Sequence, residues 1–70
     1  MQEADVITRA RITRRELMKQ RMLTEQSIAR LIEQRCGLNP HRLRDTIGCV
    51  MQEDVESMTL TYTFFQKHGR

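Results

Sequence analysis

Arginines are the side chains most suited to binding a ligand in this chain, because cysteine and histidine, which most often supply nucleophiles or hold transition metals, are sparse. Two cysteines and two histidines are present, and none of them has the spacing of two to four residues that chelating pairs usually show. No catalytic motif and no glycine-rich phosphate loop is found. We therefore expect a protein that is not an enzyme and holds no metal or cofactor. Cys36 and Cys49 are expected to be small buried apolar residues rather than a disulfide or a redox contact.

The distribution of charge is more informative than the net charge of +3. Residues 1–8 carry a net charge of −2, residues 9–44 carry +7, and residues 45–70 carry −2. A basic centre between acidic ends favours a single face that binds a polyanion. The alternative is that the arginines only solvate helix surfaces, some of them paired with glutamates, as Arg21 and Glu25 would be on one helix.

The length of the chain limits it to a single domain, residues 1–70. A chain this short buries only about 60% of its unfolded surface, so association with a second copy would stabilise it, and we expect a homodimer. No stretch approaches the roughly 20 apolar residues that cross a bilayer. The N-terminus is acidic and lacks the basic start and apolar run of a signal peptide. These features predict a cytoplasmic protein with no membrane partner.

The clearest secondary-structure element is a strand over residues 58–65. In the segment MTLTYTFF, apolar residues alternate with threonines, which is typical of a half-buried strand. A lone strand leaves its backbone groups unsatisfied, so this one needs a partner. Two candidates exist. One is the N-terminal segment 1–12, which alternates weakly and is predicted to be an arm or a short strand, and the other is the same strand of a second copy.

Residues 14–36 are predicted to be helical, because they contain neither proline nor glycine and their apolar residues recur at spacings near 3.6. TRRE at positions 13–16 is typical of a capping box, in which Thr13 accepts a hydrogen bond from the amide of Glu16. The segment is either one long helix or two helices divided near LTEQ, with Thr24 as the second N-cap. Two helices are favoured, since one long helix would leave so small a domain short of packing partners.

The stretch RCGLNPHRLRDTI, residues 35–47, predicts a tight corner between two helices. Gly37 stands where a left-handed residue ends a helix. Asn39 is suited to an N-cap and Pro40 to the first helical position. A further helix is therefore expected over residues 40–50. Together these elements predict a mainly α, three-helix domain with a helix-turn-helix corner at Gly37 and a C-terminal strand.

The segment IEQRCGLNPHRLRDTI, residues 32–47, resembles the first helix-turn-helix of AraC-type regulators. The matching positions are Gly37, Leu38, Asn39, Pro40, Leu43 and Ile47. The segment departs from the motif at Glu33, where the family has a small alanine, and at Thr46, where it has an apolar residue. The resemblance covers 16 of the 70 residues and implies a DNA-binding unit whose second helix enters the major groove.

Two sets of DNA-binding residues follow from this hypothesis. The set expected to reach base edges, where an arginine can bind guanine with two hydrogen bonds, is His41, Arg42 and Arg44. The set expected to contact phosphates from the preceding helix is Arg14, Arg15, Lys19 and Arg21. The sequence thus predicts a small, dimeric transcription regulator of bacterial or mobile-element type that binds double-stranded DNA.

The alternative hypothesis is a non-enzymatic protein-binding regulator, such as an adaptor, an anti-activator or a small chaperone. It would dock on another regulatory protein through its amphipathic, methionine-rich helix. The residues expected to contact a partner or a second copy are Met18, Met22, Tyr62, Phe64 and Phe65. The two hypotheses differ on Arg42 and Arg44, because DNA binding requires these two arginines to be exposed on one face together with Arg14 and Lys19.

Overall fold

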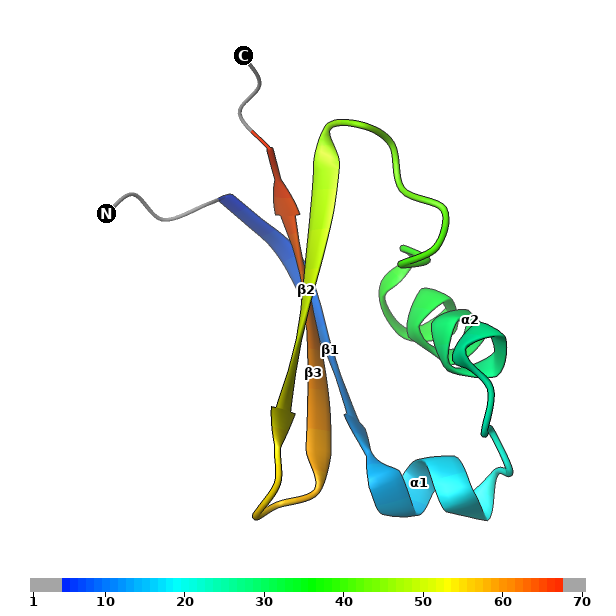
Figure 1. Ribbon diagram of the computed structural model, residues 1–70. Helices are drawn as coiled ribbons and strands as arrows, with labels where there is room; N and C mark the ends of the chain where they lie inside the picture. Colours follow the sequence, from blue (N-terminus) through cyan, green and yellow to red (C-terminus); the bar gives the residue numbers. More distant parts are fainter. Residues whose placement is uncertain (1–4, 68–70) are drawn as a thin grey trace.

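A three-stranded antiparallel sheet forms the centre of the fold, and both helices lie on one of its faces (Figure 1). The computed structural model describes residues 5–67. Strands outnumber helices, and the strand order in the sheet is β1-β3-β2. In chain order the elements are β1 (Asp5–Thr13), α1 (Arg14–Lys19), α2 (Glu25–Cys36), β2 (Ile47–Asp54) and β3 (Thr59–Gln66). The chain is therefore a small α+β fold.

Strand β3 is central and pairs with both neighbours. Its register with β1 runs from Asp5 opposite Gln66 to Thr13 opposite Thr59. Strand β2 pairs with its other edge, from Ile47 opposite Gln66 to Asp54 opposite Thr59. The predicted C-terminal strand is confirmed, and of its two candidate partners the N-terminal segment is the one that pairs with it. Residues 1–4 of that segment lie outside the described residues.

The core lies between the sheet and the helices. Its three fully buried large side chains come from three different elements, Ile12 from β1, Ile32 from α2 and Phe64 from β3. Leu17, the buried residue of α1, joins the same cluster. Burying one such side chain contributes about 1.5–3 kcal/mol relative to exposure, so these contacts hold the two helices on the sheet.

The prediction of a mainly α, three-helix domain is wrong. Within residues 5–67 no helix follows Gly37, because residues 38–46 form a loop with turns and strand β2 begins at Ile47. The side-chain oxygen of Asn39 accepts a hydrogen bond from the amide of His41 at 2.8 Å, so Asn39 closes a turn instead of capping a helix. Residues 47–54 instead form strand β2, which pairs with the second edge of β3. Pairing between strands cannot be predicted from the sequence around Asn39 alone.

The segment over 14–36 is two helices. Helix α1 begins at Arg14, and its N-cap Thr13 accepts a hydrogen bond from the amide of Glu16 at 3.0 Å, as predicted. The Glu16 carboxylate pairs with Arg35 instead of returning to Thr13, so the predicted capping box is only half formed. Helix α2 begins at Glu25 with Thr24 as its N-cap. Gly37 ends α2 in the left-handed conformation, at φ 84°. The favoured two-helix alternative is confirmed.

The second face of the sheet has no helix on it (Figure 1). Strand periodicity places Thr61, Thr63 and Phe65 of β3 on this face. The far edge of the Phe65 ring lies over Gly48 of β2, where a Cβ atom would stand 2.5 Å from the ring Cζ. Position 48 therefore has no space for a side chain while Phe65 keeps this position.

Candidate nucleic-acid interface

The end of α1 is a tight left-handed turn built on an arginine. The amide of Met22 donates to the carbonyl of Leu17 at 2.9 Å, and the amide of Arg21 donates to the carbonyl of Met18 at 3.1 Å. These two bonds define a Schellman motif, in which the left-handed residue is usually glycine. Here Arg21 occupies that position, at φ 57°. The turn reverses the chain within a few residues and leads directly to the N-cap of α2.

The start of α2 is fixed by a reciprocal capping box. The Thr24 hydroxyl accepts from the amide of Ser27 at 3.1 Å, and the Ser27 hydroxyl accepts from the amide of Thr24 at 3.2 Å. In Figure 1 α1 and α2 point in different directions on the same side of the sheet. Residues 14–36 thus contain two helices joined by a tight turn. No helix-turn-helix forms at Gly37, where the sequence predicts one, because a loop and strand β2 follow that residue.

The outer face of α2 carries polar side chains that the fold does not use. The inner face buries Ala29, Leu31 and Ile32. Gln26 and Arg30 are exposed, and their side chains make no hydrogen bond or ion pair with any residue between 5 and 67. Because they stand four positions apart, they lie on the same side of the helix, one turn from each other.

The loop after α2 is fastened to this helix by Asn39. The Asn39 amide donates to a carboxylate oxygen of Glu33 at 3.1 Å. Its side-chain oxygen accepts from the amide of His41, and its carbonyl accepts from the amide of Arg42 at 3.0 Å. Glu33, which departs from the AraC-type motif, is therefore the point on α2 that holds the loop. The fastening fixes His41 and Arg42 relative to the helix.

A polar hollow of about 450 Å³ lies between the outer face of α2 and this turn. Two arginines and a histidine border it, with one carboxylate, Glu25, at the start of the helix. The excess of donors over acceptors favours a ligand that carries acceptor atoms or negative charge. The lining residues are Glu25, Gln26, Ala29, Arg30, Asn39, His41 and Arg42.

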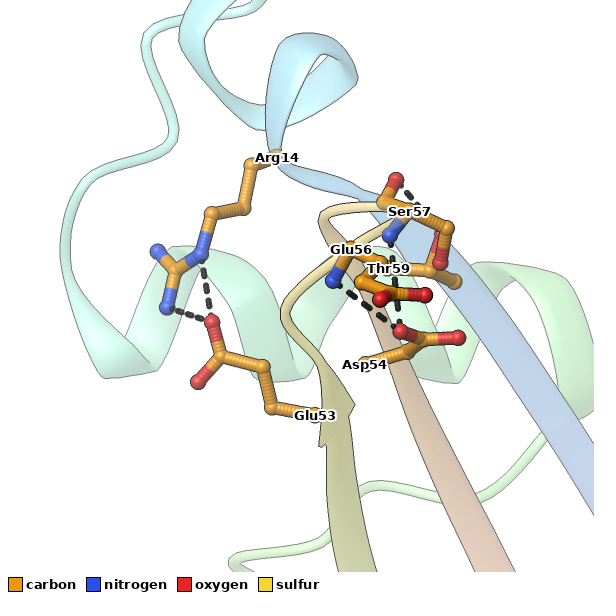
Figure 2. A network of polar contacts seen from close by, with 6 residues as sticks. All are labelled: Arg14, Glu53, Asp54, Glu56, Ser57 and Thr59. Carbon is orange, nitrogen blue, oxygen red and sulfur yellow. Dashed lines mark hydrogen bonds and ion pairs between the residues drawn. The ribbon is translucent and has the colours of Figure 1, made fainter.

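Two other arginines have structural roles. Arg14 binds Glu53 of β2 through Nε at 2.8 Å and Nη2 at 2.6 Å, both to the same carboxylate oxygen (Figure 2). Arg35 forms an ion pair with Glu16 and also donates to the backbone carbonyl of Arg11 at 2.8 Å. Arg14 thus ties α1 to the β2–β3 hairpin, and Arg35 ties α2 to α1 and β1.

The predicted DNA-binding residues separate into two groups. His41 and Arg42 border the polar hollow beside Arg30, Arg44 is exposed further along the same loop, and Arg21 is exposed in the turn between the helices. Arg15 and Lys19 line a different hollow, beside α1, together with Arg14. Of the seven, only Arg14 forms an ion pair within the described part of the chain. The structure therefore places Arg42 beside α2, in a different hollow from Arg14 and Lys19. The single basic face that the DNA-binding hypothesis required of these residues is not formed, so a DNA-binding surface would have to consist of α2 and the loop that follows it.

The predicted partner contacts are spread over the molecule. Met18 is 70% exposed on α1. Met22 and Tyr62 are half-buried and pack against the core. Phe64 is fully buried, so it is a core residue and offers no contact surface. Phe65 lies on the opposite face of the sheet, against Gly48.

Gln26 and Arg30 are the residues that the sequence interpretation missed. Their exposure can be predicted from the sequence, because a helix that starts after the N-cap Thr24 and buries Ala29 and Ile32 exposes positions 26 and 30. The sequence prediction omits them because it places the recognition helix after Gly37 instead of at α2.

Two half-buried residues near the core, Cys49 and Tyr62, have raised pKa values. Cys36 and Cys49 are half-buried free thiols. Burial raises the pKa of the Cys49 thiol, and the nearby Cys36 raises it further. Burial also raises the pKa of Tyr62, with smaller contributions from Cys49 and Glu25. Among residues 5–67 no three His, Cys, Asp or Glu side chains are placed to share a metal ion, and neither helix has the length and apolar character needed to span a membrane.

Comparisons with known proteins identify no relative of this chain. No family model matches it, and neither a curated protein nor a solved structure matches it significantly.

Proposed function

We propose that the protein is a small, non-enzymatic transcription regulator that binds double-stranded DNA, with α1 and α2 as its helix-turn-helix. One observation carries the proposal. Gln26 and Arg30, unpaired and one turn apart on the outer face of α2, lie beside the unpaired Arg42 of a loop that Asn39 fastens to the same helix. A protein with this role would act in the cytoplasm.

Base recognition would be the task of α2. Its 12 residues span about 18 Å, and the major groove admits one α-helix. The Arg30 guanidinium can donate two hydrogen bonds to O6 and N7 of guanine, and the Gln26 amide can pair with N6 and N7 of adenine. Glu25 adds an acceptor for the amino group of cytosine.

Phosphate contacts would come from the segments on either side of α2. Arg21 precedes the helix, and Arg42 and Arg44 follow it, all exposed. The backbone at Arg21 supports this role, since a left-handed conformation costs a non-glycine residue about 1–2 kcal/mol. A phosphate contact made by the Arg21 guanidinium would explain why an arginine, and not a glycine, occupies this strained position.

The first test measures the dependence of affinity on salt, by fluorescence anisotropy with a mixed-sequence duplex between about 50 and 200 mM salt. The logarithm of the binding constant should fall linearly with the logarithm of salt concentration, by about 0.9 for each phosphate contacted. Arg42→Ala should reduce the magnitude of this slope by about one. Arg9→Ala is the matched control, because Arg9 is exposed and strand alternation places its side chain opposite that of the buried Ala10, on the face of the sheet without helices. Absence of binding at the lowest salt, or equal losses in both variants, would contradict the proposal.

The second test separates base recognition from charge. A preferred duplex is first selected from a random pool with the wild-type protein. Arg30→Lys keeps the positive charge but cannot form the two-bond contact with guanine. It should bind mixed DNA as the wild type does, while its preference for the selected duplex falls by about 1–3 kcal/mol. If the preference is unchanged, α2 is not the element that recognises bases.

A further inference from the structure

The end of the molecule where β1 enters α1 exposes apolar side chains beside positive charge. Met18 of α1 is 70% exposed and Met58 of the β2–β3 turn is 55% exposed. They line the same hollow, of about 900 Å³, together with the basic residues Arg15 and Lys19. Neither cation forms an ion pair with another residue of the range 5–67. The hollow is thus lined by exposed apolar side chains and by two positive charges that no carboxylate of the described residues neutralises.

The hollow is held in shape by bonds between α1 and the turn. The amide of Arg14 donates to the carbonyl of Met58 at 2.9 Å, and the side chain of Arg14 binds Glu53. The turn is closed from within, since the Asp54 carboxylate accepts from the amides of Glu56 at 3.1 Å and Ser57 at 3.4 Å (Figure 2). A surface fixed in this way loses little conformational entropy when it binds a partner.

The tip of the same turn has the opposite character. Val55 is 77% exposed. Glu56 is exposed, and its carboxylate has no bonding partner within the described chain. Glu53, Asp54, Val55 and Glu56 together line an acidic hollow that adjoins the tip. One end of the molecule therefore presents an acidic apolar projection next to a basic apolar hollow, and such a surface is complementary to itself.

We propose that this end is a homodimer interface, in which the β2–β3 turn of one copy enters the hollow beside α1 of a second copy. Val55 would pack on the partner's Met18, and Glu56 would face the partner's Lys19. A two-fold axis repeats both contacts, as closed dimers require. The second copy is the partner that the charges favour, because the same chain supplies both complementary surfaces. The inference does not depend on DNA binding.

The test exchanges the two charges. Lys19→Glu and Glu56→Lys each place like charges opposite one another twice in the dimer, so each variant should dissociate at roughly tenfold higher concentration than the wild type. The double variant, with both substitutions on one chain, should recover dimerisation. An equimolar mixture of the two single variants should form a heterodimer, because every facing pair is then of opposite sign. Sedimentation equilibrium over a wide concentration range measures all four samples, with circular dichroism to verify folding.

Val55→Asp probes the apolar part of the contact and should also yield monomers. Arg9→Glu makes the same charge change as Lys19→Glu on β1, outside both hollows, and should leave the dimer intact. A wild-type chain that stays monomeric at millimolar concentration overturns the proposal. So does a mixture of the two single variants that remains monomeric, or an Arg9→Glu variant that dissociates as readily as Lys19→Glu.

Discussion

The two helices end in the same backbone conformation but with different residues. Helix α2 ends at Gly37, at φ 84°, and helix α1 is followed by Arg21, at φ 57°. A Cβ atom at Gly37 would meet nothing within 4 Å, so glycine is required there by the backbone alone. At the end of α1 the left-handed residue is Arg21, whose side chain makes this backbone conformation unfavourable by about 1–2 kcal/mol. The proposed phosphate contact of Arg21 would explain this difference, because a glycine has no cation to offer.

Met58 is a second non-glycine residue in the left-handed conformation. Apart from Arg21, the only non-glycine residue between positions 5 and 67 with positive φ is Met58, at φ 53°. Met58 lines the hollow that we assign to the dimer interface. The two strained side chains thus lie in the two surfaces to which we assign binding, and the unstrained Gly37 lies between α2 and its loop. Backbone strain at functional surfaces is the general expectation.

The largest change in stability is expected at Gly48, where the Phe65 ring, and not the backbone conformation, leaves no space for a side chain. Gly48→Ala would place a Cβ atom 2.5 Å from Cζ of Phe65, so the ring must move. Overpacking of this kind costs about 1–3 kcal/mol of the free energy of unfolding. Urea denaturation of Gly48→Ala, Phe65→Leu and the double variant measures the coupling. The smaller leucine should recover part of the loss, and purely additive effects would show that the Phe65 ring does not restrict this position.

Gly37→Ala should have the next largest effect, about 1–2 kcal/mol of destabilisation, from the left-handed conformation alone. Because the added methyl group meets open space, no truncation of a neighbour should recover it. Gly37→Asn is the graded control, since asparagine tolerates this conformation better and should lose less. Denaturation midpoints of the three proteins check this order. If alanine and asparagine are both neutral, Gly37 does not require the left-handed conformation.

The sequence predicted the local features of this fold better than the long-range ones. The caps Thr13 and Thr24 and the helix end at Gly37 depend on residues within one or two turns, and all three are found where expected. The strand over 58–65 was visible from its alternation and is found at 59–66. Strand β2 was missed because Asn39 and Pro40 resemble a helix start, while its actual partner, β3, follows several residues later in the chain.

The candidate site was only partly predictable for the same reason. The sequence predicts that His41 and Arg42 belong to a helix. The structure instead holds them in a loop beside an exposed polar hollow, through the bonds of Asn39 to Glu33 and His41. Arg14 could not be distinguished from the unpaired cations, since its partner Glu53 is 39 residues away in the chain. Ion pairing between distant elements decides which arginines remain available, and a single sequence does not show that pairing.

Arg21→Gly tests the comparison directly, because stability and binding should change in opposite directions. Removing the strained side chain should raise the free energy of unfolding by up to about 1 kcal/mol. The same substitution should weaken binding to mixed duplex DNA and reduce the magnitude of the salt slope by about one. Arg21→Ala is the matched control, which loses the charge but keeps the strain. A variant that is stabilised and binds DNA as the wild type does would leave the strain without a functional explanation.

The smallest effect is a dependence on pH that the helix-end variants should not share. Burial raises the pKa of Cys49 above its ordinary value of 9.0, and that of Tyr62 above 10.0. Between the unfolded and the raised folded pKa, the folded state retains a proton that the unfolded state has lost. The free energy of unfolding should therefore be constant near neutral pH and fall as the pH rises above about 9.

Two variants test this dependence on pH. Cys49→Ser should make the decline in the free energy of unfolding shallower. Arg21→Gly should differ from the wild type by the same amount at every pH tested, because the backbone strain that this substitution removes does not depend on pH. Thermal denaturation from pH 7 to about 10 distinguishes the two kinds of change, and a pH-dependent difference for Arg21→Gly would mean that Arg21 acts on stability through its charge and not through its backbone.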